Sequence, residues 1–430
     1  MVGPALRRWF EAKAIRPALA LAFACLAHPA FADGAFPDEL TVSLPANAPN
    51  RIILGTNFGL VVSEDGGQTW RFVCELFITG TTAELINFYK LASDGALFAV
   101  SAAHLWRSSD VGCSWARAGG TADSVNVSDA FVDPRDSTFV VALASSRSGS
   151  QSGIYPSHDG GRTFEPPLYT TPDVLTGVEI ASSSGTLYAT QVQRTGTAGN
   201  AYLLKSTDRG AHWIQQQLAV PPDTLPRIAA VDPVDADKVY LRLLRPPNDS
   251  IAIATDDGRT LSSAVTLSSG IDYFSSFLRT DDGTLYAGTI GGDLYVQAPG
   301  ETGFTRRVGP KTRCLGQRPG TSRIYACGDW LLDGYNLGYS DDGARTFQPM
   351  MSFTQIAGPL TCPAVNEFCY SQFIILQQTL GVGLDAGTPD GGQGPAKPGS
   401  HCSGVGGAGL ALVLAQFFRR RTRPRSFSGK

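Results

Sequence analysis

The sequence SEDGGQTW (63–70) recurs along the chain and decides the fold. Further copies with the same Ser, Asp and final aromatic positions are SSDVGCSW (108–115), SHDGGRTF (157–164), STDRGAHW (206–213) and SDDGARTF (340–347). ATDDGRTL (254–261) is a weaker copy, and QAPGETGF (297–304) keeps only the Gly and the aromatic residue. Successive copies lie 43 to 49 residues apart, so the sequence contains seven repeats of similar length.

A short apolar segment precedes each copy and is rich in β-branched and aromatic residues, as buried strands are. The seven segments are RIILGT (51–56), ALFAVS (96–101), TFVVAL (138–143), TLYATQ (186–191), KVYLRL (238–243), TLYAGT (284–289) and RIYACG (323–328). With the turns between them, each repeat has room for four strands. This pattern predicts an all-β fold, a seven-bladed β-propeller of four-stranded blades.

The recurring motif has a local physical explanation. An Asp side chain can close a turn by accepting hydrogen bonds from backbone N–H groups further along the chain. Gly permits positive φ in that turn, and the aromatic ring is buried between strands or blades. We therefore expect a structural role for Asp65, Trp70, Asp110, Trp115, Asp159, Phe164, Asp208, Trp213, Asp256, Asp342 and Phe347.

These repeats resemble the BNR or Asp-box repeats of sialidases, other glycoside hydrolases and sortilin-type receptors. The resemblance covers about residues 40–350 and implies the propeller, whereas unrelated activities share that fold. The F/Y-R-I-P motif of sialidases does not occur, which disfavours that activity. Other propeller glycosidases need only two carboxylates facing each other across the axis, so a glycoside hydrolase remains the alternative function.

Both ends of the chain are predicted to be targeting segments. Residues 1–32 combine four basic residues, the apolar run ALALAFACLA (18–27) and the cleavage site Ala30-Phe31-Ala32, as a signal peptide does. We expect the propeller over residues 33–381, a Gly/Pro-rich linker over 382–401 and a tail over 402–430.

The tail contains Cys402, the short apolar run VGGAGLALVLAQFF (405–418) and the cluster RRRTRPR (419–425). This order resembles the C-terminal sorting tails of myxobacterial surface proteins, which are processed near the cysteine. The resemblance implies retention at the cell surface, and a plain membrane anchor is the alternative. In both cases the tail contacts the envelope membrane.

Charge is distributed unevenly along the chain. The net charge is −3, but residues 1–32 and 401–430 together carry ten basic residues and one acidic residue. Without these ends the chain has 25 basic and 37 acidic residues, a net charge of −12. Nucleic-acid binding requires clustered Lys and Arg, so we expect no nucleic-acid partner. The sequence shows no cofactor motif and no metal cluster, and we expect a monomer.

Six cysteines remain between the signal peptide and the tail, and an even number in an exported chain indicates disulfides. The pairs Cys74–Cys113, Cys314–Cys327 and Cys362–Cys369 are our expectation among fifteen connectivities, and six free thiols are the alternative. GPLTCPAVNEFCYSQFIILQQTLG (358–381) is too short for an eighth blade. We expect it to form a closing strand or a capping helix near ELTVSL (39–44).

The loops between the second and third strands are longest in four blades and should lie opposite the Asp motifs. They are SSRSGSQSGI (145–154), VQRTGTAGNAY (192–202), LRPPNDS (244–250) and GDWLLDGYNLG (328–338). Variable loops on a rigid scaffold are where binding sites usually lie. The candidate ligand-binding residues there are Asp329, Trp330, Asp333 and Tyr335, with Tyr273 and Phe274 as a second group.

These observations favour an exported, surface-retained, non-catalytic propeller. Its expected partner is an extracellular protein or a glycan, bound through the variable loops. Paired carboxylates at an open axis would instead favour the glycoside hydrolase.

Overall fold

A computed structural model describes residues 39–80, 84–101, 103–146, 149, 151–193 and 199–382. All of them belong to one compact unit. The expected signal peptide, the linker from residue 383 onward and the tail with Cys402 lie outside the described residues.

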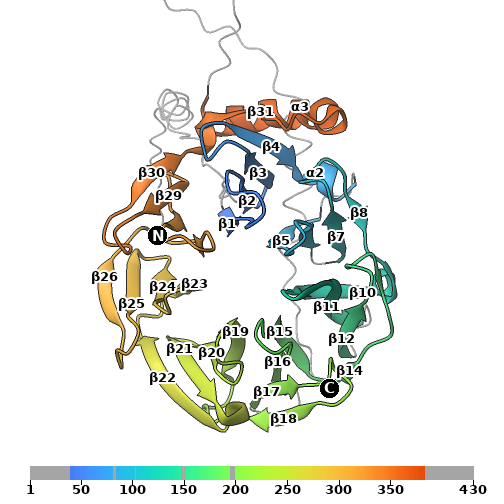
Figure 1. The fold of residues 1–430 in the computed structure, drawn as a ribbon, viewed down its shortest axis with the longest axis vertical. Coiled ribbons are helices and arrows are strands. Elements are labelled where there is room, and N and C mark those ends of the chain that lie inside the picture. Colours follow the sequence, from blue (N-terminus) through green and yellow to red (C-terminus); the bar gives the residue numbers. More distant parts are fainter. Residues whose placement is uncertain are drawn as a thin grey trace, which may run out of the picture. The chain divides into compact units, whose positions relative to one another are not determined.

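Seven antiparallel four-stranded sheets are arranged in a ring (Figure 1). The prediction of an all-β, seven-bladed propeller is confirmed. Blade 1 contains β1 (Glu39–Ser43), β2 (Ile52–Thr56), β3 (Gly59–Ser63) and β4 (Trp70–Cys74). Blade 2 contains β5 (Ile86–Leu91), β6 (Leu97–Ser101), β7 (Leu105–Ser108) and β8 (Ala116–Arg117). Blade 3 contains β10 (Val125–Asp133), β11 (Asp136–Ser146), β12 (Ser152–Ser157) and β14 (Tyr169–Thr171).

The remaining blades follow in chain order. Blade 4 contains β15 (Val174–Ile180), β16 (Leu187–Val192), β17 (Ala201–Ser206) and β18 (Ile214–Gln217). Blade 5 contains β19 (Leu225–Val231), β20 (Val239–Arg245), β21 (Asn248–Thr255) and β22 (Thr260–Leu267). Blade 6 contains β23 (Phe274–Arg279), β24 (Leu285–Thr289), β25 (Asp293–Gln297) and β26 (Thr305–Val308). Blade 7 contains β27 (Cys314–Gln317), β28 (Ile324–Cys327), β29 (Leu337–Ser340) and β30 (Gln348–Met351).

Short elements connect these sheets. Strands β9 (Gly119–Gly120) and β13 (Thr163–Phe164) form a small parallel pair, and helix α2 (Glu75–Ile78) follows β4. The apolar segments expected from the sequence form the second strands of the blades. β2, β6, β24 and β28 are buried along their whole length, so the core lies between the faces of neighbouring blades.

The first motif copy forms a turn between β3 and β4 that is organised by one carboxylate. Asp65 accepts hydrogen bonds from the backbone N–H groups of Gln68 (3.0 Å) and Thr69 (2.9 Å), and from the Thr69 hydroxyl (2.7 Å). These bonds, those from Thr69 foremost, lower the pKa of Asp65 to about 2. Two successive residues with positive φ, Gly66 (78°) and Gly67 (96°), complete the turn.

Four other copies form similar turns, in which the Asp carboxylate accepts the backbone N–H of the residue four positions later in the chain. They are centred on Asp110, Asp159, Asp208 and Asp342. The copy in blade 5 differs, because Ala254 stands where these five copies have Ser. Its Asp256 side chain interacts with the Arg259 guanidinium at 3.2 Å. The aromatic rings of the motif are buried or half-buried beside these turns.

The ring closes between blades 7 and 1 at three levels. At the axis, β1 lies beside β27. At the end where the Asp turns lie, the Arg318 guanidinium donates hydrogen bonds to the carbonyl groups of Pro45 (3.3 Å), Ala48 (3.3 Å) and Arg51 (2.9 Å). At the rim, β31 (Ile356–Pro359) pairs in parallel with β4 as a fifth strand of blade 1.

Helix α3 (Pro363–Thr379) follows β31 and lies on the outside of the ring (Figure 1). Residues 358–381 therefore form the end of a strand and a helix. They pack against the outermost strand of blade 1, whereas the N-terminal strand β1 is its innermost strand, so the expected position near residues 39–44 is wrong. The helix buries Val365, Cys369, Phe373 and Leu376, which lie on one of its faces.

Two disulfides connect α3 to the ring. Cys369 pairs with Cys74 at the end of β4, and Cys362 pairs with Cys113 in the Asp turn of blade 2. The third disulfide, Cys314–Cys327, joins neighbouring strands of blade 7 as expected. The expected pairs Cys74–Cys113 and Cys362–Cys369 are wrong. Cys362 is the N-cap of α3 and Cys369 lies two turns into the helix, about 10 Å further along its axis, which is too far for a disulfide.

We expect the Cys113–Cys362 bond to contribute more stability than Cys314–Cys327, because it closes a far longer loop. The sequence separations are 249 and 13 residues. The intact Cys74–Cys369 bond already links these ends through the 39 residues from 74 to 113 and the seven from 362 to 369. In the chain-entropy description, C113S/C362S should therefore lower the free energy of unfolding by roughly 1 kcal/mol more than the control C314S/C327S. Urea unfolding of both double variants measures this difference. Equal losses, or peptide mapping that joins Cys113 to another cysteine, would contradict the account.

Candidate functional site

The two ends of the ring carry different kinds of connection. Because the strands within each blade are antiparallel, the Asp turns between third and fourth strands lie at the same end as the turns between first and second strands. The loops between second and third strands lie at the other end, together with the blade-to-blade connections. We call this second end the loop face. It contains all six residues that the sequence suggested for ligand binding.

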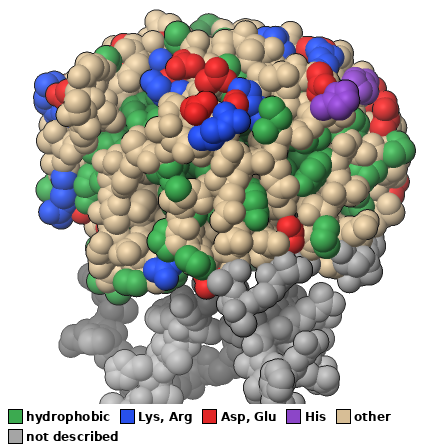
Figure 2. Space-filling model, turned by 90° about the horizontal axis from the view of Figure 1, so that it is seen from below, with side chains coloured by type: hydrophobic (Ala, Val, Ile, Leu, Met, Phe, Trp, Pro, Cys, Tyr) green, Lys and Arg blue, Asp and Glu red, His purple; other side chains and the backbone are tan. Residues whose placement is uncertain are grey.

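The wall of the ring is an unfavourable place for a site, because its charges are paired locally. Figure 2 shows acidic and basic side chains mixed on the wall formed by the blades at the lower edge of Figure 1. In this region Lys205 Nζ contacts both Asp237 (2.5 Å) and Asp257 (2.7 Å). Charges paired in this way are satisfied within the protein.

Two carboxylates lie on neighbouring inner strands at the axis, Asp129 on β10 and Glu179 on β15. Asp129 Oδ2 accepts the backbone N–H of Val178 in blade 4 (3.0 Å), and Glu179 Oε1 accepts that of Val231 in blade 5 (2.8 Å). Burial raises the pKa of Glu179 to about 7 and also raises the pKa of Asp129. A catalytic pair would need carboxylates free to reach a substrate. Their bonds to the next blade instead favour a role in joining the blades.

A continuous arc of loops crosses the loop face from blade 5 to blade 7, and we call residues 268–273, 290–292, 308–313 and 328–336 the loop arc. Asp272 Oδ1 accepts the N–H of Gly291 (2.8 Å), and the Gly309 N–H binds the Gly292 carbonyl (2.9 Å). The Lys311 N–H then binds Asp333 Oδ2 (2.9 Å). Each loop of the arc is thus hydrogen-bonded to the next.

The loop arc presents large apolar side chains to the solvent. The exposed fractions are 87% for Ile271, 42% for Tyr273, 89% for Val308, 70% for Leu331 and 64% for Leu332. Sequence reasoning selected Tyr273 and overlooked the four aliphatic residues. The adjacent pair Leu331-Leu332 inside a Gly- and Asp-containing loop was a usable signal. Exposed apolar side chains gathered on one face of a protein are typical of an interaction surface.

The first group of predicted residues lies in the blade 7 loop of this arc and holds that loop in place. Asp333 accepts the N–H groups of Lys311 and Asp329 (2.8 Å), and Asp329 accepts that of Leu331 (3.0 Å). Trp330 is half-buried in the same turn, and Tyr335 is buried against Gly328 and Gly338. The structure therefore brings all four together, with both carboxylates engaged in holding the loop.

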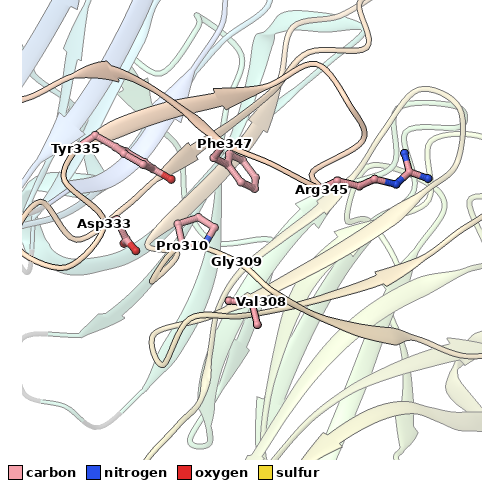
Figure 3. Close-up of a pocket in the computed structure, with 7 residues that line it drawn as sticks. All are labelled: Val308, Gly309, Pro310, Asp333, Tyr335, Arg345 and Phe347. Carbon is pink, nitrogen blue, oxygen red and sulfur yellow. The ribbon is translucent and has the colours of Figure 1, made fainter.

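A shallow cavity of about 190 Å³ lies beside this loop, between blades 6 and 7 (Figure 3). Its walls are Val308, Gly309, Pro310, Asp333, Tyr335, Arg345 and Phe347. Figure 3 shows the Arg345 side chain extending away from Asp333, with the apolar side chains between them. Burial, with Asp333 nearby, raises the pKa of the Tyr335 hydroxyl above its ordinary value, so this side chain is neutral.

The second predicted group lies at the other end of the arc. Phe274 is buried at the start of β23, and its ring lies 5.7 Å from that of Tyr295. Tyr273 precedes it on the surface, where the Arg242 guanidinium lies 5.6 Å from the ring centre. Phe274 and Arg242 also border a second cavity, of about 220 Å³, between blades 5 and 6. The two predicted groups thus mark opposite ends of one surface.

Neither a metal site nor a membrane-spanning helix is found in the described part of the chain. No three His, Cys, Asp or Glu side chains there are grouped as metal ligands would be. No helix over the described ranges is both long and apolar enough to cross a bilayer. The three disulfides are typical of proteins in an oxidising, extracellular-type compartment.

Comparisons with known proteins give the fold alone. No family model and no curated protein matches the chain. Among solved structures, YCF48 from Cyanidioschyzon merolae is 14% identical with a TM-score of 0.47, and the match covers 67% of this chain and 92% of that one. Prolyl oligopeptidase B from Galerina marginata is 11% identical with a TM-score of 0.52, and the match covers 74% of this chain and 50% of that one.

A third neighbour is the GH74 xyloglucanase from Xanthomonas campestris. It is 13% identical with a TM-score of 0.36, and the match covers 72% of this chain and 77% of that one. YCF48 and the xyloglucanase fall below a TM-score of 0.5, so of these three matches only the one to prolyl oligopeptidase B supports the fold. Their activities differ, and identities this low do not carry an activity over to this chain.

We expect the carboxylate of Glu179 to make stability depend on pH. Its pKa is about 7 in the folded protein and 4.5 ordinarily, so between these values the folded state binds more protons than the unfolded state. The free energy of unfolding should therefore fall as pH rises from 4.5 to 7. Glu179→Gln keeps the acceptor oxygen without the charge, and should be more stable than wild type at pH 8 by about 1–3 kcal/mol.

Urea unfolding at pH 5 and pH 8 measures this effect, with Glu165→Gln on the surface as the matched control. The two variants and wild type should differ little at pH 5. A Glu179→Gln protein that is destabilised equally at both pH values would show that the negative charge itself is required.

Proposed function

We propose that this chain is an exported, non-catalytic propeller, retained at the cell surface, that binds an extracellular protein through the loop arc. The observation that carries the proposal is the exposure of Ile271, Tyr273, Val308, Leu331 and Leu332 along loops that are hydrogen-bonded to one another. Their exposure costs solubility unless a partner covers them. The hydrogen bonds between the loops pre-organise the surface and reduce the entropy lost on binding.

The character of the arc favours a protein over a glycan. Four of its five exposed apolar side chains are aliphatic, whereas sugar rings are usually held by aromatic faces and polar groups. Asp272, Asp329 and Asp333 accept backbone N–H groups within the arc, which commits those oxygens to the loop structure. Apolar centres surrounded by polar residues are typical of protein interfaces.

Surface retention rests on the ends of the chain. The signal peptide over residues 1–32 and the tail over 402–430 remain sequence predictions. The disulfides support an oxidising location for the folded part.

Photo-crosslinking on intact producing cells tests the binding face. A photoreactive amino acid at Leu332 should crosslink to one discrete protein. The same residue at Val234, which is 78% exposed on the Asp-turn end, serves as the matched control and should not. A glycan array and a panel of fluorogenic glycosides should give no signal. Equal crosslinking from both positions, or reproducible glycoside turnover, would overturn the proposal.

Mass spectrometry of the mature C-terminus tests the tail independently. Surface material should lack the arginine cluster over residues 419–425, because processing near Cys402 removes it. Protein recovered from the cell surface with Lys430 intact would contradict processing and would favour the plain anchor.

A further inference from the structure

Two arginines face each other across the first ladder of blade 5. Arg227 on β19 and Arg242 on β20 are direct cross-strand partners, and Ile251 continues the row on β21. Like charges in directly opposed positions destabilise a sheet. The corresponding pairs in blades 3 and 4 are Asn126–Ser145 and Val174–Val192, which are uncharged. Blade 5 therefore has an unfavourable pair that the propeller architecture does not require.

Only one of the two guanidinium groups is neutralised by contact. Arg242 forms a two-pronged ion pair with the buried Asp249, at 2.8 and 3.1 Å. Arg227 is exposed, and no hydrogen bond or ion pair engages it among the residues the structure describes. The carboxylate of Asp129 attracts it through space, but its oxygens accept the N–H groups of Ala130 and Val178.

Both arginines line the cavity of about 220 Å³ between blades 5 and 6. The other walls are largely apolar and come from Ile228, Ala229, Ile251, Phe274 and Phe277. Ser275 and Ser276 also line the cavity. The Ser275 hydroxyl donates to the Thr312 carbonyl, whereas the buried Ser276 hydroxyl has no hydrogen-bonding partner in the described part of the chain. The cavity thus combines the unpaired guanidinium of Arg227, the guanidinium of Arg242 that is paired with Asp249, and an apolar wall.

We propose that this cavity binds a carboxylate attached to a small apolar group, with Arg227 as its direct partner. A planar guanidinium matches a carboxylate with two parallel hydrogen bonds. Since Asp249 already neutralises Arg242, one positive charge is left over, which fits a single carboxylate better than a doubly charged phosphate. The apolar walls receive the attached group and exclude water from the ion pair.

The same chemistry occurs in the C-terminal residue of a peptide, in a free organic acid and in a sugar acid. Aromatic and aliphatic walls favour the first two over the hydroxyl-rich third. The proposal does not depend on the loop arc binding a protein, because a small anion can be tested directly.

Isothermal titration and ligand-observed NMR with the full chain test the site. Phenylacetate and N-acetylphenylalanine should bind, whereas phenylacetamide, phenyl phosphate and glucuronate should bind more weakly. Arg227→Met should weaken phenylacetate binding about tenfold or more, as expected for loss of a charged hydrogen-bond pair. Arg227→Lys should retain part of the affinity.

Arg259→Gln is the matched control, since Arg259 is an exposed arginine of the same blade at its opposite end. It should leave binding unchanged, and melting curves should show that all variants are folded. Equal binding of phenylacetate and phenylacetamide, unchanged affinity in Arg227→Met, or no binding up to the solubility limit would each overturn the proposal. Stronger binding of glucuronate than of phenylacetate would assign the site to sugar acids and would overturn the claim that the carboxylate carries an apolar group.

Discussion

Closing the ring is the constraint on which the rest of this structure depends. Seven blades bury their faces only against each other, so an open ring would leave two sheet faces exposed. This chain closes with β1 beside β27, Arg318 on three carbonyl groups of blade 1, and β31 added to the outside of β4. The two disulfides of α3 then connect the end of the ring covalently to blades 1 and 2.

Neighbouring blades are joined by hydrogen bonds from backbone N–H groups to carboxylates, and local sequence does not reveal these bonds. At four junctions, a carboxylate that belongs to one blade or directly follows it accepts the backbone N–H of a residue in the innermost strand of the next blade. This occurs for Glu75 with Ile86, Asp129 with Val178, Glu179 with Val231 and Asp249 with Phe274. Such bonds satisfy backbone groups near the axis and fix the angle between neighbouring blades. They also explain why acidic residues at the axis do not by themselves indicate catalysis.

The same use of carboxylates shapes the loop arc, where Asp272, Asp329 and Asp333 hold the loops and aliphatic side chains face the solvent. The sequence pointed to polar and aromatic residues there, and the structure places them in or beside the loop arc. Their roles differ from the expectation, because an Asp in a loop bonds to nearby N–H groups as readily as to a ligand. Phe274 illustrates the same limit, since its burial depends on packing against Ile251 and Leu267 of blade 5.

The sequence by itself determined the seven repeats, the four strands of each, the Asp turns and the end at which the long loops lie. All of these follow from local patterns with a fixed period, in which neighbours along the chain are neighbours in space. Only the tertiary structure decided that Cys74 pairs with Cys369, that Arg227 opposes Arg242, and that loops of three blades join into one surface. These contacts join residues from different strands, blades or ends of the chain, and their partners are set by strand register and ring closure.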